Sequence, residues 1–460
     1  MEKISLPKGT RDFGPEQMAK RQFIIDSIKK VFQRYGFQPL ETPAIENLST
    51  LTGKYGDEGD QLLFKILNSG DFLKDVDAEK LESKNSKLIA SDISEKGLRY
   101  DLTVPFARYV VMHRHEIAFP FKRYQIQPVW RGDRPAKARY REFYQCDADV
   151  VGTDSLVCEA EIILMIKDAF KALGINDYSI KINHRGILSG LAELLGASEN
   201  ENSLFVAIDK IDKIGEEKVK EELQARGFNA NALPLLFEIL NFKGSTMQKI
   251  VMLTSKFENS AKGKKGVTDI TEVFSLLGKY DATEEHIEFD ISLARGLSYY
   301  TGCIFEVKIN NVAIGSVSGG GRYDNLTGVF DSKEKSSGVG FSFGIDRLYD
   351  SMEELNIFPK ETSAASTLLI THLDSDGFEY GLKTVQAFRE RGIASEIYPD
   401  QVKIKKQMEY ADRKKIPFVV VIGPEEVQTQ TLTLKKMETG NQLKLSFEEI
   451  ATAIQLFNKN

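Results

Sequence analysis

The sequence predicts an α+β domain on a mainly antiparallel sheet, interrupted by a helical insertion and followed by a smaller α/β domain. Apolar and polar residues alternate strictly in 123–131, 143–151 and 303–309, and alternation over neighbouring strands is typical of antiparallel sheets with one packed face. Residues 190–285 lose this pattern and are rich in Leu, Glu and Lys at helical spacing. In 364–460 strands alternate with helices, which favours an α/β arrangement.

The elements of the first domain follow from caps, prolines and periodicity. Pro15 in the first turn and Gly36 after the last turn bracket an amphipathic helix. Extended chain follows, because Pro39 and Pro43 exclude a helix. Residues 67–97 are polar and irregular, so we expect an elaborated loop there.

Residues 98–151 are predicted to form strands, and Asp101 and Thr103 share one face of one of them. Asp154 is expected to cap a helix that ends at Gly174. The predicted boundaries are 1–189 and 286–358 for the two parts of the sheet domain, 190–285 for the insertion, Pro359–Ser366 for a linker and 364–460 for the α/β domain.

Length and composition are those of a globular protein. The 460 residues suggest about three domains at roughly 150 residues each. Hydrophobic residues make up 42% of the chain and charged residues 28%, which excludes a disordered or fibrous protein. No apolar run approaches the roughly 18 residues of a membrane helix, and the N-terminal residues lack the apolar core of a secretory signal. We expect no membrane partner.

The cysteines and histidines suggest no ligand set. Cys146, Cys158 and Cys303 are odd in number and widely spaced, which fits neither a disulfide framework nor a zinc site. The five histidines form no cluster in the sequence, so we expect no metal site built from protein side chains. A reducing, cytoplasmic location is expected. The net charge of −6 neither favours nor excludes nucleic acid, because positive charge can be clustered locally.

Arginine placement is the most informative feature of the sequence. Arg131 ends a strand beside a glycine, Arg295 lies in LARGLSYYTG and Arg347 lies in GFSFGIDRL. A planar guanidinium matches phosphate oxygens bidentately, and glycine permits a ligand to approach closely. Single surface arginines more often pair with carboxylates, but several around one sheet suit a polyphosphate.

One face of the strand 143–151 carries a ring, an amide and two carboxylates: Phe143, Gln145, Asp147 and Asp149. Neighbouring carboxylates on a half-buried face repel unless they meet a cation. A solvated strand face and a site for an ammonium or imidazole donor are both open. Asp101 and Thr103 would add a carboxylate and a hydroxyl to such a site, and Tyr299 and Tyr300 an aromatic wall.

The run of three glycines in SVSGGGRYDNL, 319–321, is a weaker motif. It lacks the lysine and the Ser or Thr of a P-loop and the spaced glycines of the dinucleotide fingerprint. A tight turn or bulge and a ligand role are both open here.

Together, these segments resemble the histidyl-tRNA synthetase family of the class II aminoacyl-tRNA synthetases. LPKGTRDFGP resembles the opening of that family, GFQPLETPAIE its motif 1, VWRGDRPAKARYREFYQCDAD its motif 2 and GFSFGIDRL its motif 3. LARGLSYYTG and SGGGRYDNL resemble segments peculiar to the histidine enzyme. The resemblance covers almost the whole chain. It implies the class II synthetase fold, with a mixed, mainly antiparallel sheet, a helical insertion and a C-terminal α/β anticodon-binding domain.

The resemblance implies a histidine–tRNA ligase reaction. Histidine and ATP would give histidyl-adenylate and pyrophosphate, and the histidyl group would pass to the 3′ end of tRNA(His). A carboxylate that attacks a phosphate brings two anions together, so preorganised cations lower the barrier and no protein nucleophile is needed. The family further implies Mg²⁺ beside ATP, a homodimer whose interface motif 1 builds, and the cytoplasm.

The family motifs also imply roles for the nucleotide side. Arg131 would hold the α-phosphate, and Arg295 would bridge it to the histidine carboxylate, which makes both residues catalytic. Arg347 would clamp the γ-phosphate and Phe143 would stack on adenine. Contacts to the acceptor end of the tRNA are expected from three basic residues of the motif 2 turn: Arg134, Lys137 and Arg139.

On the amino-acid side, the resemblance implies that three residues bind the α-ammonium group: Asp101, Thr103 and Gln145. Asp149 and Tyr300 would bind the imidazole nitrogens, with Tyr299 either as a wall of the site or as a residue behind those that contact histidine. Buried polar partners reject analogues that leave them unpaired, by roughly 10⁴-fold or more. In the C-terminal domain, basic residues of 403–415 could meet tRNA phosphates, although a solvated helix face is equally open.

Three other functions compete with this one. A synthetase-like regulatory subunit of histidine biosynthesis typically lacks the C-terminal domain and the catalytic arginines, whereas Arg131, Arg295 and Arg347 are present here. A nucleotide-dependent oxidoreductase would need the glycine fingerprint and a parallel sheet before Pro359. A plain RNA-binding module would not explain the acidic strand face.

Overall fold

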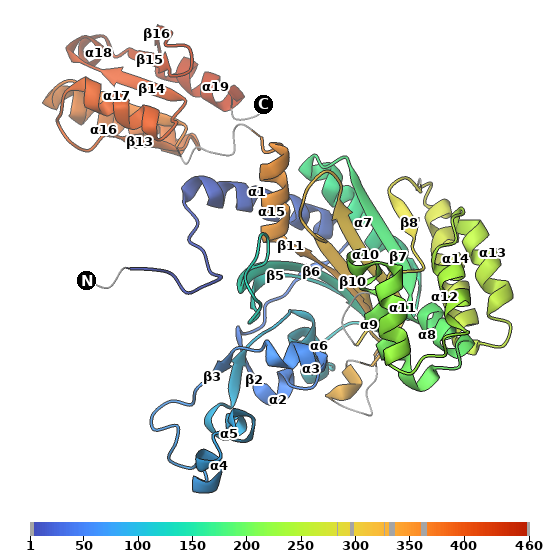
Figure 1. Cartoon of the computed structure of the whole chain (residues 1–460). Coiled ribbons are helices and arrows are strands. Elements are labelled where there is room, and N and C mark those ends of the chain that lie inside the picture. Colours follow the sequence, from blue (N-terminus) through green and yellow to red (C-terminus); the bar gives the residue numbers. More distant parts are fainter. Residues whose placement is uncertain are drawn as a thin grey trace. The chain divides into compact units, whose positions relative to one another are not determined.

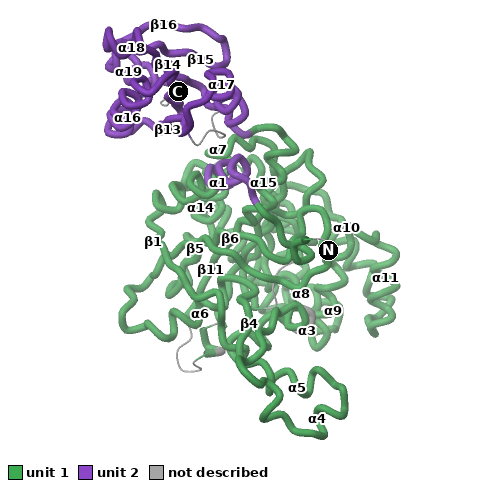
Figure 2. Tube along the Cα trace, turned by 90° about the vertical axis from the view of Figure 1, so that its left-hand side faces the viewer, with its two compact units in different colours: residues 1–12, 24–357 green, residues 13–23, 358–460 purple. Residues whose placement is uncertain are grey.

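The computed structural model describes residues 4–282, 284–294, 299–325, 327–330, 336–359 and 366–457. The chain forms two compact units (Figure 2), the first made of Met1–Asp12 and Ile24–Ile357 and the second of Phe13–Phe23 and Phe358–Asn460. Among the described helices, none combines the length and the apolar character that a bilayer-spanning segment requires.

The first unit is built on an eight-stranded sheet in the order β1-β5-β6-β11-β10-β9-β7-β8 (Figure 1). The pairs β1–β5 and β7–β8 at the two edges are parallel and the pairs between them antiparallel. The predicted mixed, mainly antiparallel sheet is therefore confirmed. The strands are β1 (Gln38–Pro39), β5 (Phe121–Trp130), β6 (Glu142–Val151), β7 (Tyr178–His184), β8 (Ile287–Phe289), β9 (Cys303–Ile309), β10 (Ser318–Arg322) and β11 (Gly338–Gly344).

Two helices cover one face of this sheet, which leaves the opposite face for the site. Phe341 and Phe343 of β11 pack against Phe32 of α1 (Pro15–Arg34), with ring centroids 5.8 and 6.5 Å apart. Phe170 of α7 (Val157–Leu173) also contacts Phe343, at 5.9 Å. The predicted bounds of α1 are confirmed, and Gly36 has the positive φ of 79° that a residue without a side chain adopts readily.

The prediction of a loop over 67–97 is wrong in part. The segment holds two short helices, α4 (Ala78–Glu82) and α5 (Ser86–Ile93), capped by the side chains of Asp77 and Asn85. Its end contributes to a small sheet of β2 (Ile45–Asn47), β4 (Lys96–Leu98) and β3 (Lys65–Ile66). Neither helix buries a residue, so no apolar periodicity marked them; the caps were the available signal.

The prediction of strands throughout 98–151 is also wrong. Residues 103–112 form the helix α6 (Thr103–Met112), so Asp101 and Thr103 do not share a strand face. Its Val and Phe residues are typical of strands, but Val104, Ala107 and Val110 are buried at helical spacing. Asp154 does not cap α7 either: Leu156 occupies the cap position and the Val157 amide donates to the Ser155 hydroxyl at 3.4 Å.

Between β7 and β8 the described chain is helical, in the block of helices at one end of the sheet in Figure 1. The helices are α8 (Arg185–Leu194), η1 (Ser198–Asn200), α9 (Glu201–Ile208), α10 (Ile211–Ile214), α11 (Glu216–Ala225), α12 (Leu233–Leu240), α13 (Thr246–Lys256) and α14 (Ala261–Lys279). Helices α8 and α14 approach closely where glycine faces glycine: a Cβ on Gly190 would lie 2.7 Å from the Gly263 Cα.

The remaining helices of the first unit are α2 (Leu48–Leu51), α3 (Gly56–Gln61), η2 (Thr327–Val329) and α15 (Ile345–Leu355). Helix α15 begins directly where β11 ends, so motif 3 is a strand–helix corner with Arg347 in the first turn of the helix.

The second unit is a five-stranded sheet in the order β13-β12-β14-β15-β16. The first three strands are parallel and the last two pairs antiparallel. The predicted α/β arrangement is confirmed, with a terminal hairpin added, while residues 360–365 of the predicted linker lie outside the described residues. The elements are β12 (Leu368–His372), α16 (Ser375–Glu390), β13 (Ser395–Ile397), α17 (Ile404–Arg413), β14 (Phe418–Ile422), α18 (Pro424–Thr429), β15 (Leu432–Lys436), β16 (Gln442–Leu445) and α19 (Phe447–Phe457).

The close approach of α8 and α14 makes Gly190→Ala destabilising. The added methyl group would force the helices apart or displace the Phe257 ring, which would lie 3.1 Å from the new Cβ, at a cost of about 1 to 3 kcal/mol. Urea unfolding followed by circular dichroism should show a lower midpoint. Gly278→Ala is the control, because nothing lies within 4 Å of its Cβ position in α14 and alanine there favours the helix by about 1 kcal/mol. Equal midpoints for the two variants would contradict the packing argument.

Candidate active site

The floor of the site is the face of β6, β11 and β10 that lies opposite α1 and α7, where glycine makes room for larger side chains. Asp149 lies opposite Gly340, and Gly340 lies opposite Gly321. A Cβ on Gly340 would stand 2.0 Å from Asp149 Oδ1, and one on Gly321 would stand 2.9 Å from the Tyr300 ring. The glycine run 319–321 is therefore neither a turn nor a bulge but part of a central strand, in which Gly321 leaves space for Tyr300, while Gly340 on the neighbouring strand leaves space for Asp149.

The acidic strand face is buried, so the interpretation of a solvated face is wrong. Asp147 and Asp149 are each 2% exposed. Arg123 on the neighbouring strand β5 is fully buried and its Nη2 lies 2.8 Å from Asp149 Oδ2, while the Tyr323 hydroxyl donates to Asp149 Oδ1 at 2.7 Å. The cation that this face requires is thus a protein side chain.

Burial governs the protonation of both carboxyl groups. It raises the pKa of Asp149, while the charge of Arg123 and the hydrogen bond from Tyr323 act in the opposite direction. Burial also raises the pKa of Asp147 to about 7, with Arg123 opposing and the negative charge of Asp149 adding to the rise. Arg123 therefore favours the charged form of both groups, against the cost of removing them from water.

Asp101 lies at the start of α6, where three donors hold its carboxylate. The Val104 amide and the Tyr55 hydroxyl each donate to Oδ1 at 3.1 Å, and the Tyr299 hydroxyl donates to Oδ2 at 3.1 Å. Burial raises the pKa of Asp101, and the Val104 amide and the Arg131 charge lead the opposing effects. Thr103 is the first residue of the helix and bonds the Tyr299 hydroxyl. The structure therefore brings Asp101, Thr103 and Tyr299 together.

Arg131, Phe143 and Gln145 form a second group at the end of β5 and the start of β6. Arg131 Nη2 lies 3.5 Å from Gln145 Oε1, and its guanidinium carbon is 5.1 Å from the Phe143 ring centroid. The Arg131 Nε donates to the Tyr100 carbonyl at 3.1 Å. Gln145 Nε2 donates to the Ser342 hydroxyl at 2.8 Å, which joins this group to the glycine-rich strands.

Motif 3 meets the motif 2 turn through Arg347. Its Nε donates to the Ala138 carbonyl at 3.2 Å and its Nη1 to the Ser316 carbonyl at 2.6 Å. Two of the three candidates for tRNA contact are in ion pairs here: Lys137 with Glu354 at 2.9 Å and Arg139 with Asp133 at 2.6 Å. The third, Arg134, is exposed. Arg295 lies outside the described residues, so its position stays a prediction.

Sequence reasoning missed several residues of this site. Arg123, Tyr323, Ser342 and Tyr55 all bond residues that had been predicted. Arg123 could have been considered from the sequence, because it lies in the alternating segment 123–131. Its pairing with Asp149, however, depends on the register between the two strands, which the sequence does not give. Within the described ranges, no three His, Cys, Asp or Glu side chains gather as metal ligands would.

This sheet, with arginines flanking a carboxylate-lined face, defines a class II aminoacyl-tRNA synthetase. The model of the family described as histidyl-tRNA synthetase matches residues 70–348, and that of an anticodon binding domain matches residues 367–456. The chain belongs to the histidyl-tRNA synthetase family.

Individual relatives match almost from end to end. A histidine–tRNA ligase of Cytophaga hutchinsonii is 58% identical over 98% of this chain and 99% of its own length. One of Christiangramia forsetii is 50% identical over 99% of this chain and its whole length, 100%. The crystal structure of histidyl-tRNA synthetase from Nostoc sp. PCC 7120 is similar with a TM-score of 0.84 and 29% identity, covering 99% of both chains.

A fourth protein shares the fold alone. It is an ATP phosphoribosyltransferase regulatory subunit/histidyl-tRNA synthetase from Bacillus halodurans C, with a TM-score of 0.71 and 21% identity over 91% of this chain and 98% of that one. The fold therefore does not separate a ligase from the regulatory subunit considered above. The separation comes from the ligase relatives, which match this chain at 50% identity or more over nearly its whole length.

The raised pKa of Asp147 predicts a pH-dependent stability. The native carboxyl group holds its proton up to a pH of about 7 and the unfolded group only up to 3.8, so this group's contribution to stability falls as pH rises between these values. We expect Asp147→Asn, which has no charge to bury, to lose less stability than the wild type from about pH 5 to about pH 8. Urea midpoints at both values measure this, with the exposed Asp75→Asn as the control. Parallel losses in the wild type and Asp147→Asn would refute the burial argument.

Proposed function

We propose that this chain is a histidine–tRNA ligase: it joins L-histidine to ATP as histidyl-adenylate, releases pyrophosphate and transfers the histidyl group to the 3′ end of tRNA(His). Relatives with that name match it over nearly its whole length. The observation that carries the proposal is one sheet face on which Arg131 adjoins Gln145 while Asp149 is buried over a glycine floor. This arrangement supports one site that would offer a cation to phosphate and carboxylates to an amino acid.

ATP would bind at the end of the floor formed by motifs 2 and 3. Arg131 would bind the α-phosphate, Arg347 the γ-phosphate, and Phe143 would stack on adenine. The guanidinium of Arg131 is already fixed by the Tyr100 carbonyl and the Tyr100 ring, 4.3 Å away. Because it is oriented before ATP arrives, little reorganisation is needed as charge develops on the phosphoryl oxygens.

Mg²⁺ would accompany ATP rather than occupy a site built from several protein side chains. The ion prefers oxygen ligands and usually takes only one or two carboxylates beside phosphate and water. The carboxylate of Glu306 fits this need: it is 6% exposed and is bonded by the hydroxyl of Ser316, the residue whose carbonyl Arg347 holds. When bound, the ion would supply positive charge to the phosphates.

Histidine would lie over the carboxylates. Asp101, Thr103 and Gln145 would bind its α-ammonium group, while the buried Asp149 and Tyr300 would bind the imidazole ring. Burial raises the pKa of Tyr300, and the charges of Asp149 and Asp101 raise it further, so the phenol stays a donor at neutral pH. An amino acid with an apolar side chain would form no hydrogen bond with either Asp149 or Tyr300, and the loss of these bonds is the physical basis of rejection.

Further parts of the proposal concern tRNA, assembly and compartment. The motif 2 turn, with Arg134, Lys137 and Arg139, would meet the acceptor end, and basic residues of 403–415 would contact phosphates near the anticodon. A homodimer with motif 1 at its interface follows from the family. Three cysteines that are free and buried support a cytoplasmic, reducing compartment.

ATP–pyrophosphate exchange with each amino acid in turn tests the function, and Tyr300→Phe tests the pocket. We expect exchange with histidine only.

Removal of the Tyr300 hydroxyl should raise KM for histidine about ten-fold and change KM for ATP less than about two-fold, because the loss of a buried hydrogen bond costs about 1 to 2 kcal/mol. Tyr280→Phe, at an exposed tyrosine, is the control. Equal rises in both KM values would argue against the imidazole role.

Arg295→Ala tests the proposed bridge between phosphate and carboxylate. We expect adenylate formation to fall by about 10² to 10³ in kcat, as for loss of one donor to a developing charge, while ATP binding measured by calorimetry persists. Arg413→Ala, at an arginine whose side chain is 79% exposed, should leave adenylate formation unchanged. Turnover of Arg295→Ala near the wild-type rate would remove Arg295 from the mechanism.

A further inference from the structure

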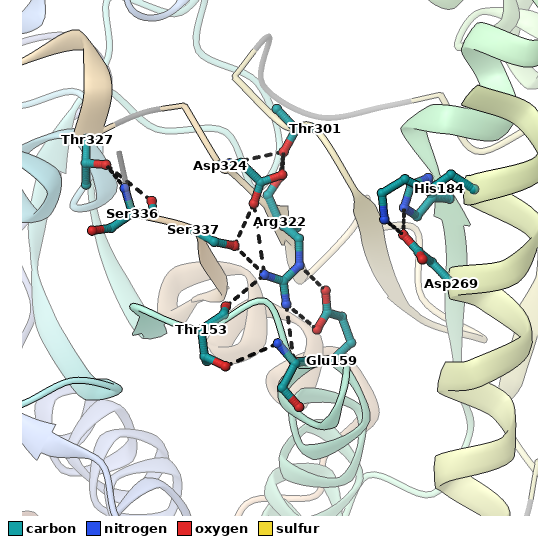
Figure 3. A network of polar contacts seen from close by, with 12 residues as sticks. Thr153, Glu159, His184, Asp269, Thr301, Arg322, Asp324, Thr327, Ser336 and Ser337 are labelled. Atoms are coloured by element: carbon teal, nitrogen blue, oxygen red, sulfur yellow. Dashed lines mark hydrogen bonds and ion pairs between the residues drawn. The ribbon is translucent and has the colours of Figure 1, made fainter. Parts of the chain in front are cut away.

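A clasp of hydrogen bonds joins the tyrosine pair of the site to the glycine-rich strand. Thr301 directly follows Tyr300 in the chain, and its hydroxyl donates to Asp324 Oδ2 at 2.7 Å (Figure 3). The same hydroxyl accepts from the Asp324 amide at 3.1 Å. The Thr301 amide donates to the Arg322 carbonyl at 2.8 Å. Three bonds thus fix one threonine to the end of β10.

The clasp is anchored on a buried ion pair. Asp324 Oδ1 accepts from the Ser337 hydroxyl at 2.6 Å, and that hydroxyl accepts from Arg322 Nη1 at 2.5 Å. Arg322 in turn binds the fully buried Glu159 of α7 with two bonds, Nε–Oε1 at 2.5 Å and Nη2–Oε2 at 2.7 Å. Its Nη1 also donates to the Thr153 carbonyl at 3.1 Å. The chain of contacts in Figure 3 therefore runs from the helical layer through the sheet to Thr301.

The position of Tyr300 depends on what holds its neighbour. Its ring rests against Gly321, which is the residue before Arg322 on β10. The clasp fixes Thr301 to the end of this same strand. The Tyr300 ring and the glycine floor are therefore both held by β10. A hydrogen bond to an imidazole ring tolerates only small displacements of its donor, and a side chain displaced by about 1 Å can cost about 10²-fold in rate.

We propose that Thr301 and Asp324 are positioning residues that set the Tyr300 hydroxyl over the floor and thereby determine the affinity for histidine. They act through Tyr300 and make no contact with substrate themselves. The inference rests on the proposed function, because it takes histidine as the ligand of Tyr300.

Thr301→Val removes the hydroxyl and keeps the shape of the side chain. We expect its KM for histidine in pyrophosphate exchange to rise at least about ten-fold and its KM for ATP to change less than about two-fold, as expected for a misplaced donor. Thr301→Ser restores the hydroxyl and should return KM for histidine to within about three-fold of wild type. Should Thr301→Val fail to fold, Asp324→Asn, of equal volume, takes its place with the same expectations.

Thr327→Val is the matched control, because Thr327 makes a similar buried clasp to another residue. Its hydroxyl accepts from the Ser336 amide at 2.9 Å and donates to the Ser336 carbonyl at 3.2 Å (Figure 3). If the Thr301 clasp were merely structural, both valine variants would lower the melting temperature and leave the ratio of the two KM values unchanged. That result would overturn the inference, as would a failure of Thr301→Ser to rescue.

A double variant separates this inference from the proposed function. In a Tyr300→Phe background, Thr301→Val should raise KM for histidine by less than about two-fold, because the hydroxyl that it positions is already gone. A full ten-fold rise in that background would mean that Thr301 does not act through Tyr300. If the wild type instead exchanged pyrophosphate with an amino acid other than histidine, the proposed function itself would fail.

Discussion

The buried ion pair of Arg123 and Asp149 is the interaction on which the site depends. Two carboxylates lie side by side on β6, and both are removed from water. Such charges are costly without a partner, and the guanidinium of Arg123, 2.8 Å from Asp149, is the partner. A buried pair of this kind adds little net stability. What it provides is an acceptor whose direction is fixed before any ligand binds.

The sheet must meet two demands for this arrangement to exist. One face is packed by aromatic rings against α1 and α7, which holds the strands rigidly. The opposite face needs volume as well as polar groups, and Gly340 and Gly321 supply it by omitting side chains beside Asp149 and Tyr300. The antiparallel register brings these features into one row. The glycines are therefore part of the recognition surface although they contribute no functional group.

The sequence predicts features that depend on neighbouring residues better than features that depend on residues far apart in the chain. Alternation within one strand is local, so it correctly grouped Phe143, Gln145 and Asp149 on one face of β6. Contacts such as Ser342 with Gln145 or Tyr55 with Asp101 join residues 197 and 46 positions apart, and only strand register and helix docking bring them together. Helix α6 was misread because its β-branched residues favour strands locally, whereas burial of one helical face decided the outcome.

The Bacillus halodurans protein shares this fold, and a fold alone does not determine function. A common sheet sets where a site can lie, but side chains on that sheet decide what it binds. The charged residues nearest a ligand are the easiest to recognise in sequence. Their directions, however, are set by neutral neighbours: phenols orient Asp101, and Ser342 orients Gln145. A chain could keep every arginine and carboxylate of the motifs and still lose its selectivity if these neutral partners changed, so they are the residues that a comparison of ligases with their regulatory relatives must examine.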